Sequence, residues 1–489
     1  MDSNTSTNHI TKTLKKDTKE LPSLLKLLAP FTWLLFLACL GTLIYYFPNA
    51  PQWTLGAVFK VNGLSIIIWT LVAFFSAIVQ TYATNYMKGF KNYQMFLILC
   101  FVFSISVMFF VASNHVVALL FFWLAMGVIM SKLIGINPNW QEARAASHYA
   151  RNNYLISTLF LGIGLLLLAF QSGKYNVSHI LQTLDNLPML TTTIASLCIL
   201  VAAIIQSAVF PFHKWLLSAM TSPTPASALM HAGFVNGAGI LLTMFAPLLF
   251  KSNILLLIFL IGGITAIVAQ FSKLLQVNVK QKLACSTSAQ MSFMVIQCGL
   301  GFFSAAITHL ILHGFYKAYL FLSAGEEIEN TVPGKQGNIK IKFFQTIAIL
   351  GVSILGGILF ALVTGKGTAL NSGLFLTFIV AITVGQITYN IINQSSLPPV
   401  KKLLLLPILI IVGIGVYALF YNGITLIMND MPMINEAVKL TSTHILFGIV
   451  FLIAFAIMLF GIYRKYPWLY VILLNISQPY SKSIISNKK

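Results

Sequence analysis

Long apolar stretches follow one another through most of this 489-residue chain, and short polar segments separate them. A membrane-spanning helix needs roughly 20 mostly apolar residues, and fourteen stretches of suitable length are present. We predict helices at 31–48, 61–86, 93–112, 115–135, 153–171, 190–213, 224–249, 253–272, 283–302, 304–324, 343–364, 371–392, 403–421 and 444–463. The pattern therefore predicts an all-α polytopic membrane protein with about 14 transmembrane helices.

Composition supports this class. Hydrophobic residues make up 58% of the chain, charged residues only 8%, and the mean hydropathy is +0.86, values outside the range of soluble globular proteins. The net charge of +20 would suggest nucleic-acid binding in a soluble protein. Here the basic residues lie in short loops between apolar stretches. We therefore expect the chain to be embedded in a lipid bilayer and not to bind nucleic acid.

The basic residues also predict the orientation in the membrane. If the N-terminus is cytoplasmic, 24 of the 30 Lys and Arg residues fall in cytoplasmic segments and five on the opposite side. The remaining one, Lys317, lies deep within a predicted span, whereas Lys132, near the cytoplasmic end of the span 115–135, is counted with the cytoplasmic residues. The positive-inside rule therefore predicts both termini inside, as in a multi-pass protein of a prokaryotic cytoplasmic (inner) membrane. We expect residues 1–30 and 466–489 to be basic cytoplasmic tails around one transmembrane domain at 31–465.

The tenth predicted span carries a regular set of ionisable residues. His309, His313 and Lys317 recur every four residues, which places them on one side of a helix in a column roughly 12 Å tall. Ionisable residues at membrane depth are costly, face the protein interior, and usually mark an ion or proton path. The column therefore predicts an ion-translocating function for the domain.

A second polar feature is a predicted break in a helix. Pro223 and Pro225 flank Thr224, and proline removes a backbone donor and clashes with the preceding turn, so a regular helix cannot continue through them. His231 follows six residues later. Imidazole can exchange a proton near neutral pH, so a proton relay beside the break is one interpretation of His231. A histidine hydrogen-bonded to a neighbouring backbone group is the alternative.

Sites for cofactors are not predicted in this chain. The five cysteines, at 39, 100, 198, 285 and 298, are scattered without CxxC spacing, so they predict neither a zinc site nor an iron–sulfur cluster. No dinucleotide-binding fingerprint or P-loop is present in the sequence. We therefore expect a transporter subunit rather than an enzyme.

Four segments resemble a known superfamily. PFHKWLLSAMTSPTPASALMHAGFVNGAGILL is similar to a signature of the antiporter-like subunits of respiratory complex I and of Mrp-type cation/proton antiporters, the NuoL/MrpA superfamily. VNGLSIII with YATNYM at 61–87, VKQKLACSTSAQMSFM at 279–294 and HLILHGFYKAYLFLSAG at 309–325 also match, in the same order. The resemblance implies an antiporter-like fold, and it places His231, His309, His313 and Lys317 on the polar axis along which the family is thought to relay protons.

The sequence also departs from the family pattern. The family usually has a glutamate where this chain has Leu124, and a lysine where it has Gln206. Those two residues form the charge pair that is thought to drive proton movement in the family, and all ten acidic residues here lie outside the predicted spans or at their ends. We expect Gln206 to be a polar contact that holds water but does not titrate. How the missing pair is compensated is open at this point.

The lost charge pair, the single span before VNGLSIII and the short segment after the last span resemble DabB-type subunits of two-component inorganic-carbon pumps. That resemblance implies a cytoplasmic, zinc-binding DabA-like partner that is similar to β-carbonic anhydrase, with cation flow (H⁺ or Na⁺) coupled to CO2 or bicarbonate uptake. Zinc is accordingly expected in the partner. Two alternatives stay open: a cation/proton antiporter subunit of an Mrp-like or complex I-like assembly, and a non-conducting membrane scaffold for a cytoplasmic enzyme.

Overall fold

The computed structural model describes residues 23–323, 343–367, 369–393, 398–459 and 461–479. Almost all regular structure in them is helical, and one short antiparallel hairpin pairs Trp53 with Val61. The elements up to the middle of the chain are α2 (Ser23–Lys26), α3 (Leu28–Tyr46), β1 (Trp53–Leu55), β2 (Phe59–Val61), α4 (Gly63–Tyr86), α5 (Tyr93–Ala112), α6 (Val116–Ile134), α7 (Gln141–Ser172), α8 (Val177–Gln182), η1 (Leu184–Asn186), α9 (Met189–Gln206), α10 (Lys214–Ser218), η2 (Ala219–Thr221), α11 (Thr224–Ala232), η3 (Phe234–Asn236) and α12 (Gly237–Met244). They are followed by α13 (Ala246–Lys251), α14 (Leu255–Leu275), α15 (Val279–Gly299), α16 (Phe303–Leu322), α18 (Phe343–Thr364), α19 (Gly373–Asn393), α20 (Pro399–Ile427), α21 (Ser442–Leu459), η4 (Ile462–Arg464) and α22 (Pro467–Ser477).

The predicted fold class is confirmed, and each of the fourteen predicted ranges overlaps a helix. Ten helices in the described part of the chain are long and apolar enough to cross a membrane. The exact number of spans and their topology stay predictions. α15 and α16 have sufficient length, at 21 and 20 residues, but contain more polar side chains, and they pack against each other inside the bundle.

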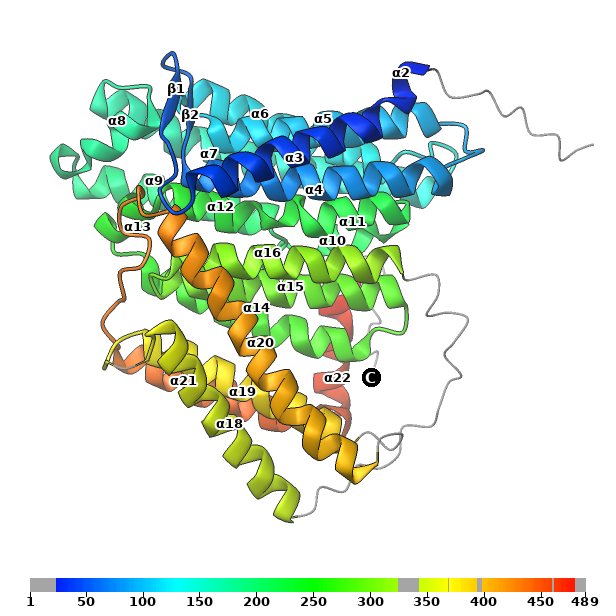
Figure 1. The fold of residues 1–489 in the computed structure, drawn as a ribbon, viewed down its shortest axis with the longest axis vertical. Coiled ribbons are helices and arrows are strands. Elements are labelled where there is room, and N and C mark those ends of the chain that lie inside the picture. The colour runs from blue at the N-terminus through cyan, green and yellow to red at the C-terminus, as the bar shows by residue number, and fades with distance from the viewer. Residues whose placement is uncertain (1–22, 324–342, 368, 394–397, 460, 480–489) are drawn as a thin grey trace, which may run out of the picture.

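The long helices from α3 to α16 run roughly side by side, whereas α18 and α20 slant away from them (Figure 1). α2 and the β1–β2 hairpin lie at opposite ends of this bundle (Figure 1). Among these ten candidate spans, the segment from α11 to α12 is the most enclosed, because 89% of the residues in its apolar stretch are buried. The corresponding share is 11% for α3, at the edge of the bundle. The interior of the protein is therefore built around α11, α12, α15 and α16.

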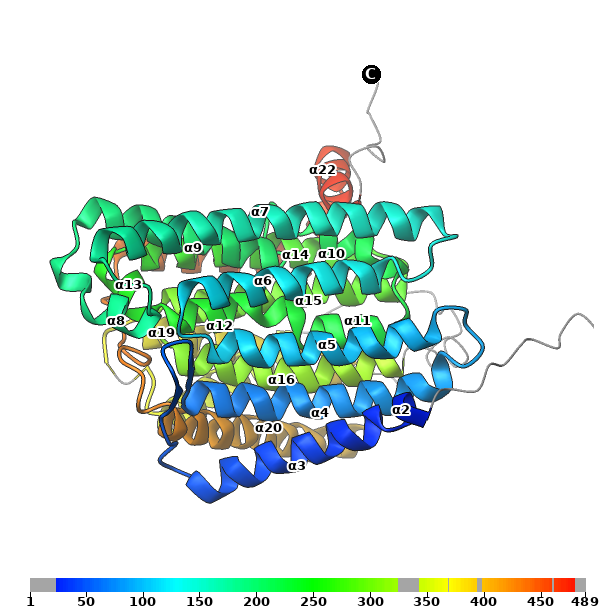
Figure 2. The ribbon, with the colours of Figure 1, turned by 90° about the horizontal axis from the view of Figure 1, so that it is seen from above.

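A further helix occupies part of the segment for which the sequence predicts a C-terminal tail. α22 packs against α14, and Figure 2 shows it outside the row of long helices. Leu473 is buried there, and the Nε2 atom of His213 lies 2.9 Å from the Ile476 carbonyl oxygen. α22 is thus attached to the segment that precedes α10. Residues 1–22 and 480–489 of the predicted tails lie outside the described residues.

The crossing of α14 and α15 depends on glycine, because the two backbones approach closely. A Cβ atom added at Gly262 would lie 2.8 Å from the Ser292 carbonyl oxygen and 2.9 Å from the Ile296 amide nitrogen. Neither backbone atom can move without displacing α15. Gly351 on α18, by contrast, has no heavy atom within 4 Å of the equivalent position.

We therefore expect Gly262→Ala to destabilise the protein and Gly351→Ala to leave it unchanged or slightly more stable. Overpacking of this kind costs about 1–3 kcal/mol, whereas alanine in an exposed helix is favoured over glycine. Thermal unfolding of the two purified variants in the same detergent would measure the difference. Equal unfolding temperatures for both variants would contradict this account of the α14–α15 crossing.

Candidate functional site

The predicted column of ionisable residues faces the inside of the bundle. Lys317 is 0% exposed, His313 is buried, and His309 lies at the edge of the buried region, all on α16. Tyr316 and Tyr319 of the same helix are exposed. α16 therefore presents Lys317 and His313 to the interior, where it contacts α11, α12 and α15, and these two tyrosines to the surroundings of the protein.

Lys317 is held by a backbone carbonyl. Its Nζ atom donates a hydrogen bond to the Leu283 carbonyl oxygen on α15 at 3.0 Å. Among the described residues it forms no ion pair with a carboxylate. A buried ammonium needs hydrogen-bond acceptors or a counter-charge, because its transfer out of water is costly. Here the dipole of the Leu283 carbonyl takes the place of the carboxylate that usually pairs with a buried ammonium.

The same carbonyl connects Lys317 to His231 on α11. The Thr287 hydroxyl donates to the Leu283 carbonyl oxygen at 3.0 Å and lies 2.9 Å from Nδ1 of His231. A carbonyl can only accept, so the Thr287 hydrogen points to Leu283, and the Thr287 oxygen accepts from Nδ1–H of His231. With the hydroxyl in this orientation, a neutral His231 carries its proton on Nδ1, and its Nε2 has no hydrogen-bond partner among the described residues. The imidazole ring also stacks on Phe321, with 4.3 Å between the ring centroids.

The two histidines of α16 have unused hydrogen-bonding capacity. Their rings are nearly parallel, at 19°, with centroids 6.2 Å apart. Both nitrogens of His313 and Nε2 of His309 are buried without a hydrogen-bond partner among the described residues. Buried polar atoms are normally satisfied by protein or water. The atoms are thus positioned to contact water or a migrating proton along the column.

Gln206 lies deep in the protein, near another close helix contact. Its side chain is buried, and neither its amide nitrogen nor its oxygen has a partner among the described residues. A Cβ atom on Gly237 would lie 2.8 Å from Cγ of Gln206 and 3.4 Å from the Trp123 ring. The Trp123 indole donates to Ser157 at 3.1 Å, while the neighbouring Leu124 is partly exposed. The structure thus surrounds the position of the missing lysine with uncharged groups.

Two of the interruptions in the segment between α9 and α13 lie next to the site residues. Pro223 and Pro225 stand at the beginning of α11, where the first turn of a helix tolerates proline. A second interruption, at Gly233 and η3, separates α11 from α12 within the predicted span 224–249. There the Ser207 hydroxyl donates to the Val235 carbonyl, and the Asn236 amide donates to the Ala232 carbonyl at 2.6 Å. Side chains therefore satisfy backbone groups that the broken helix leaves free, as a membrane interior requires.

Thr287, Ser207 and Asn236 are the functional candidates that sequence reasoning did not identify. Thr287 lies within the segment VKQKLACSTSAQMSFM, which resembles the family pattern, but nothing in its spacing indicates a contact with His231. Asn236 and Gly233 give a weak signal, because both residue types are unfavourable in the middle of a helix. The contacts of Ser207 with Val235 and of Thr287 with His231 join residues that are 28 and 56 positions apart, so they become visible only in the folded chain.

Comparisons with known proteins agree with this geometry. Residues 113–397 match the family described as NADH:quinone oxidoreductase/Mrp antiporter, TM, and residues 48–97 match the N-terminus of complex I chain 5. The probable inorganic carbon transporter subunit DabB of Hydrogenovibrio crunogenus is 31% identical over 414 residues, which cover 81% of this chain and 76% of the relative. The protein of the same description in Bacillus subtilis is 30% identical over 392 residues, with coverages of 79% and 77%.

Solved structures share the fold at lower identity. A chain of the archaeal membrane-bound sulfane sulfur reductase superposes with a TM-score of 0.59 and 18% identity, over 95% of each chain. A chain of respiratory complex I from Thermus thermophilus gives a TM-score of 0.55 and 19% identity, over 96% of this chain and 97% of the other.

The fold and the enclosed ionisable residues define an antiporter-like subunit that crosses the membrane several times. The chain belongs to the NADH:quinone oxidoreductase/Mrp antiporter family, within the NuoL/MrpA-like superfamily, and it is similar to DabB subunits. The predicted family and the multi-pass membrane location are thereby confirmed.

The contact between His231 and Thr287 leads to a prediction about stability. Thr287→Val keeps the side-chain shape but leaves Nδ1 of His231 buried without an acceptor, which costs about 1–3 kcal/mol. We expect a lower apparent unfolding temperature, and recovery of most of it in Thr287→Ser. Thr265→Val on α14 is a matched control, because Thr265 is also buried and bonds the Ile261 carbonyl of its own helix. Equal losses in the two valine variants would contradict the role of Thr287.

Proposed function

We propose that this protein is the membrane subunit of an energy-coupled inorganic-carbon transporter, in which inward flow of a cation (H⁺ or Na⁺) drives uptake of CO2 or bicarbonate. The similarity to relatives described as probable inorganic carbon transporter subunits supports the transported class. The hydration chemistry belongs to a cytoplasmic, zinc-binding DabA-like partner that resembles β-carbonic anhydrase. This chain provides the cation path.

The observation that carries the conducting role is the enclosed Lys317. An ammonium that is 0% exposed and hydrogen-bonded to a carbonyl has no structural advantage over an apolar residue of similar volume. In the proposed path Lys317 is the central charge, and His313 and His309 extend the path along α16. His231 joins the path to the interrupted segment, through Thr287.

Gln206 is the polar end of this path within the first half of the bundle. Its carboxamide has donors and an acceptor without partners in the described part of the chain, so it can bind water in a chain of hydrogen bonds but cannot store a proton. Pro223 and Pro225 begin the helix that carries His231. Proton or cation transfer then involves Lys317 and the histidines without an input pair of glutamate and lysine.

Substitution of the central charge tests the conducting role. We expect Lys317→Ala, in the assembled complex in proteoliposomes, to reduce cation flux at least about tenfold, because the residue is the intramembrane charge of the path. Lys174→Ala is the control, since Lys174 is an exposed lysine in a loop. We expect it to change flux less than about twofold. Unchanged flux and unchanged carbon-dependent growth with Lys317→Ala would refute the conducting role.

The identity of the partner separates the proposal from an antiporter subunit of an Mrp-like or complex I-like assembly. We expect a tagged chain to co-purify with one soluble zinc protein from its native host, as measured by mass spectrometry and metal analysis. Several small membrane subunits in place of the zinc protein would favour the antiporter alternative. A zinc partner combined with no cation flux under any gradient would favour a scaffold.

A further inference from the structure

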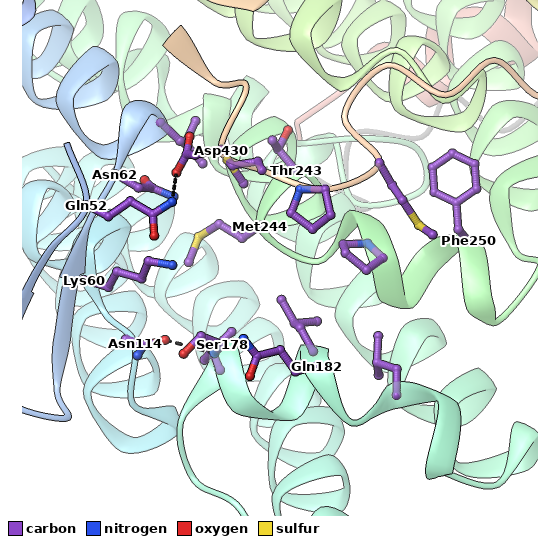
Figure 3. Close-up of a pocket in the computed structure, with 18 of the residues that line it drawn as sticks. Gln52, Lys60, Asn62, Asn114, Ser178, Gln182, Thr243, Met244, Phe250 and Asp430 are labelled. Atoms are coloured by element: carbon purple, nitrogen blue, oxygen red, sulfur yellow. Dashed lines mark hydrogen bonds between the residues drawn. The ribbon is translucent and has the colours of Figure 1, made fainter. Parts of the chain in front are cut away.

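The end of the bundle that carries the β1–β2 hairpin contains a large cavity whose wall combines charged, polar and apolar side chains. Its volume is about 730 Å³, and its wall comes from β2, the start of α4, α8, the end of α12, α13 and the loop after α20. Figure 3 shows the side chains of Gln52, Lys60, Asn62, Gln182 and Asp430 around it. On the predicted topology, with the α2 end of the bundle cytoplasmic, this cavity faces the outside.

Asp430 differs from the other acidic residues that the structure describes. Glu142, Asp185 and Glu436 are exposed, whereas Asp430 is half-buried. The Gln52 amide donates to Oδ2 of Asp430 at 3.5 Å, and Oδ1 is buried with no hydrogen-bond partner among the described residues. Burial raises the pKa of the Asp430 carboxyl above its ordinary value, so the group accepts a proton more readily than an exposed aspartate.

Two lysines and a second aspartate complete the charges of the cavity. Asp185 forms an ion pair with Lys251 at 2.9 Å, and the side chain of Asp185 is 91% exposed. Lys60 faces the cavity, and its positive charge acts on Asp430 without forming an ion pair. Asp185 is thus already paired at an exposed position, whereas Asp430 lines the cavity without an ion pair among the described residues.

The inner wall of the cavity leads toward the interrupted segment. Thr243 and Met244, at the end of α12, line it. From Thr243 to Gly237, where α12 contacts Gln206, the helix rises roughly 9 Å. A second cavity, of about 270 Å³, lies at the other end of the segment and is lined by Lys91, Ser222, Pro223 and Lys280. The interrupted segment thus runs between two cavities, each of which has lysine side chains in its wall.

We propose that the outer cavity is the site at which the coupling cation enters, and that Asp430 is the carboxylate that binds it first. The inference rests on the proposed function and adds a binding site to it. In this path the cation, a proton or Na⁺, passes from Asp430 along α12 to the region of Gln206 and His231. A carboxylate at the entrance supplies the negative charge that the interior lacks in this chain.

The test compares two aspartates of the same cavity in the assembled complex in proteoliposomes. We expect Asp430→Asn to raise the external cation concentration that gives half-maximal flux at least about tenfold, because removal of one charge at contact distance weakens cation binding. Asp430→Glu should restore most of the affinity. Asp185→Asn, which removes an exposed and paired carboxylate, should change this concentration less than about twofold.

The two proposals fail in different ways. A wild-type complex without any cation flux would overturn the proposed function. Flux in the wild type with the same half-maximal concentration in Asp430→Asn and Asp185→Asn would overturn only the entrance site. Should Asp430→Asn not assemble, Lys60→Gln decides: loss of the neighbouring positive charge should lower the half-maximal concentration, and an unchanged or raised value overturns the inference.

Discussion

The hydrogen bond from Lys317 to the Leu283 carbonyl is the interaction on which the polar interior depends. A charged ammonium inside a bundle of apolar helices must find an acceptor, and the described part of this chain offers it no carboxylate. The acceptor therefore comes from the backbone of α15, one helical turn before Thr287. The resulting hydrogen bonds connect α15 to α16 and, through Thr287, to α11. Three enclosed helices share one polar network.

The same constraint explains the surroundings of the broken segment. Where α11 ends at Ala232, the freed carbonyls accept hydrogen bonds from Ser207 and Asn236. Gly237 allows the Gln206 side chain to lie against the start of α12. These residues are small or polar in an otherwise apolar region. They stabilise an irregular backbone at a depth where bulk water is not present to form hydrogen bonds with its free groups. The irregular segment lies between the two cavities described above.

The helices could be predicted from the sequence because apolar runs of sufficient length are a strong signal in membrane proteins. Sequence reasoning placed the start of one span at residue 153, whereas α7 begins at Gln141, because the first turns of α7 are polar and hydropathy does not detect them. It read 224–249 as one helix, since the apolar character continues across the interruption at Gly233. α22 is not among the predicted spans, because this helix has only 11 residues, fewer than a membrane-spanning helix needs.

The candidate site was predictable to the extent that it lies on one helix. The spacing of His309, His313 and Lys317 places them on a common face, and the buried face of α16 agrees. Contacts between helices, such as His231 with Thr287, depend on how α11 and α15 pack, which residue spacing does not encode. Asp430 lies in a loop between apolar runs, where an acidic residue is ordinary. Only the cavity around it distinguishes this aspartate from an exposed one.

The single hydroxyl hydrogen of Thr287 has a consequence for the order of events. It cannot point to the Leu283 oxygen and to the imidazole at the same time. A rotation of the hydroxyl toward Nδ1 is compatible only with the other tautomer of a neutral His231, and it leaves the Lys317 ammonium as the side-chain donor to the Leu283 oxygen. The location of the imidazole proton and the strength with which Lys317 is bound are therefore interdependent. Exchange of these two states needs the rotation of one hydroxyl bond, the loss of the proton on Nδ1 of His231 and the gain of a proton on Nε2, without any movement of helices.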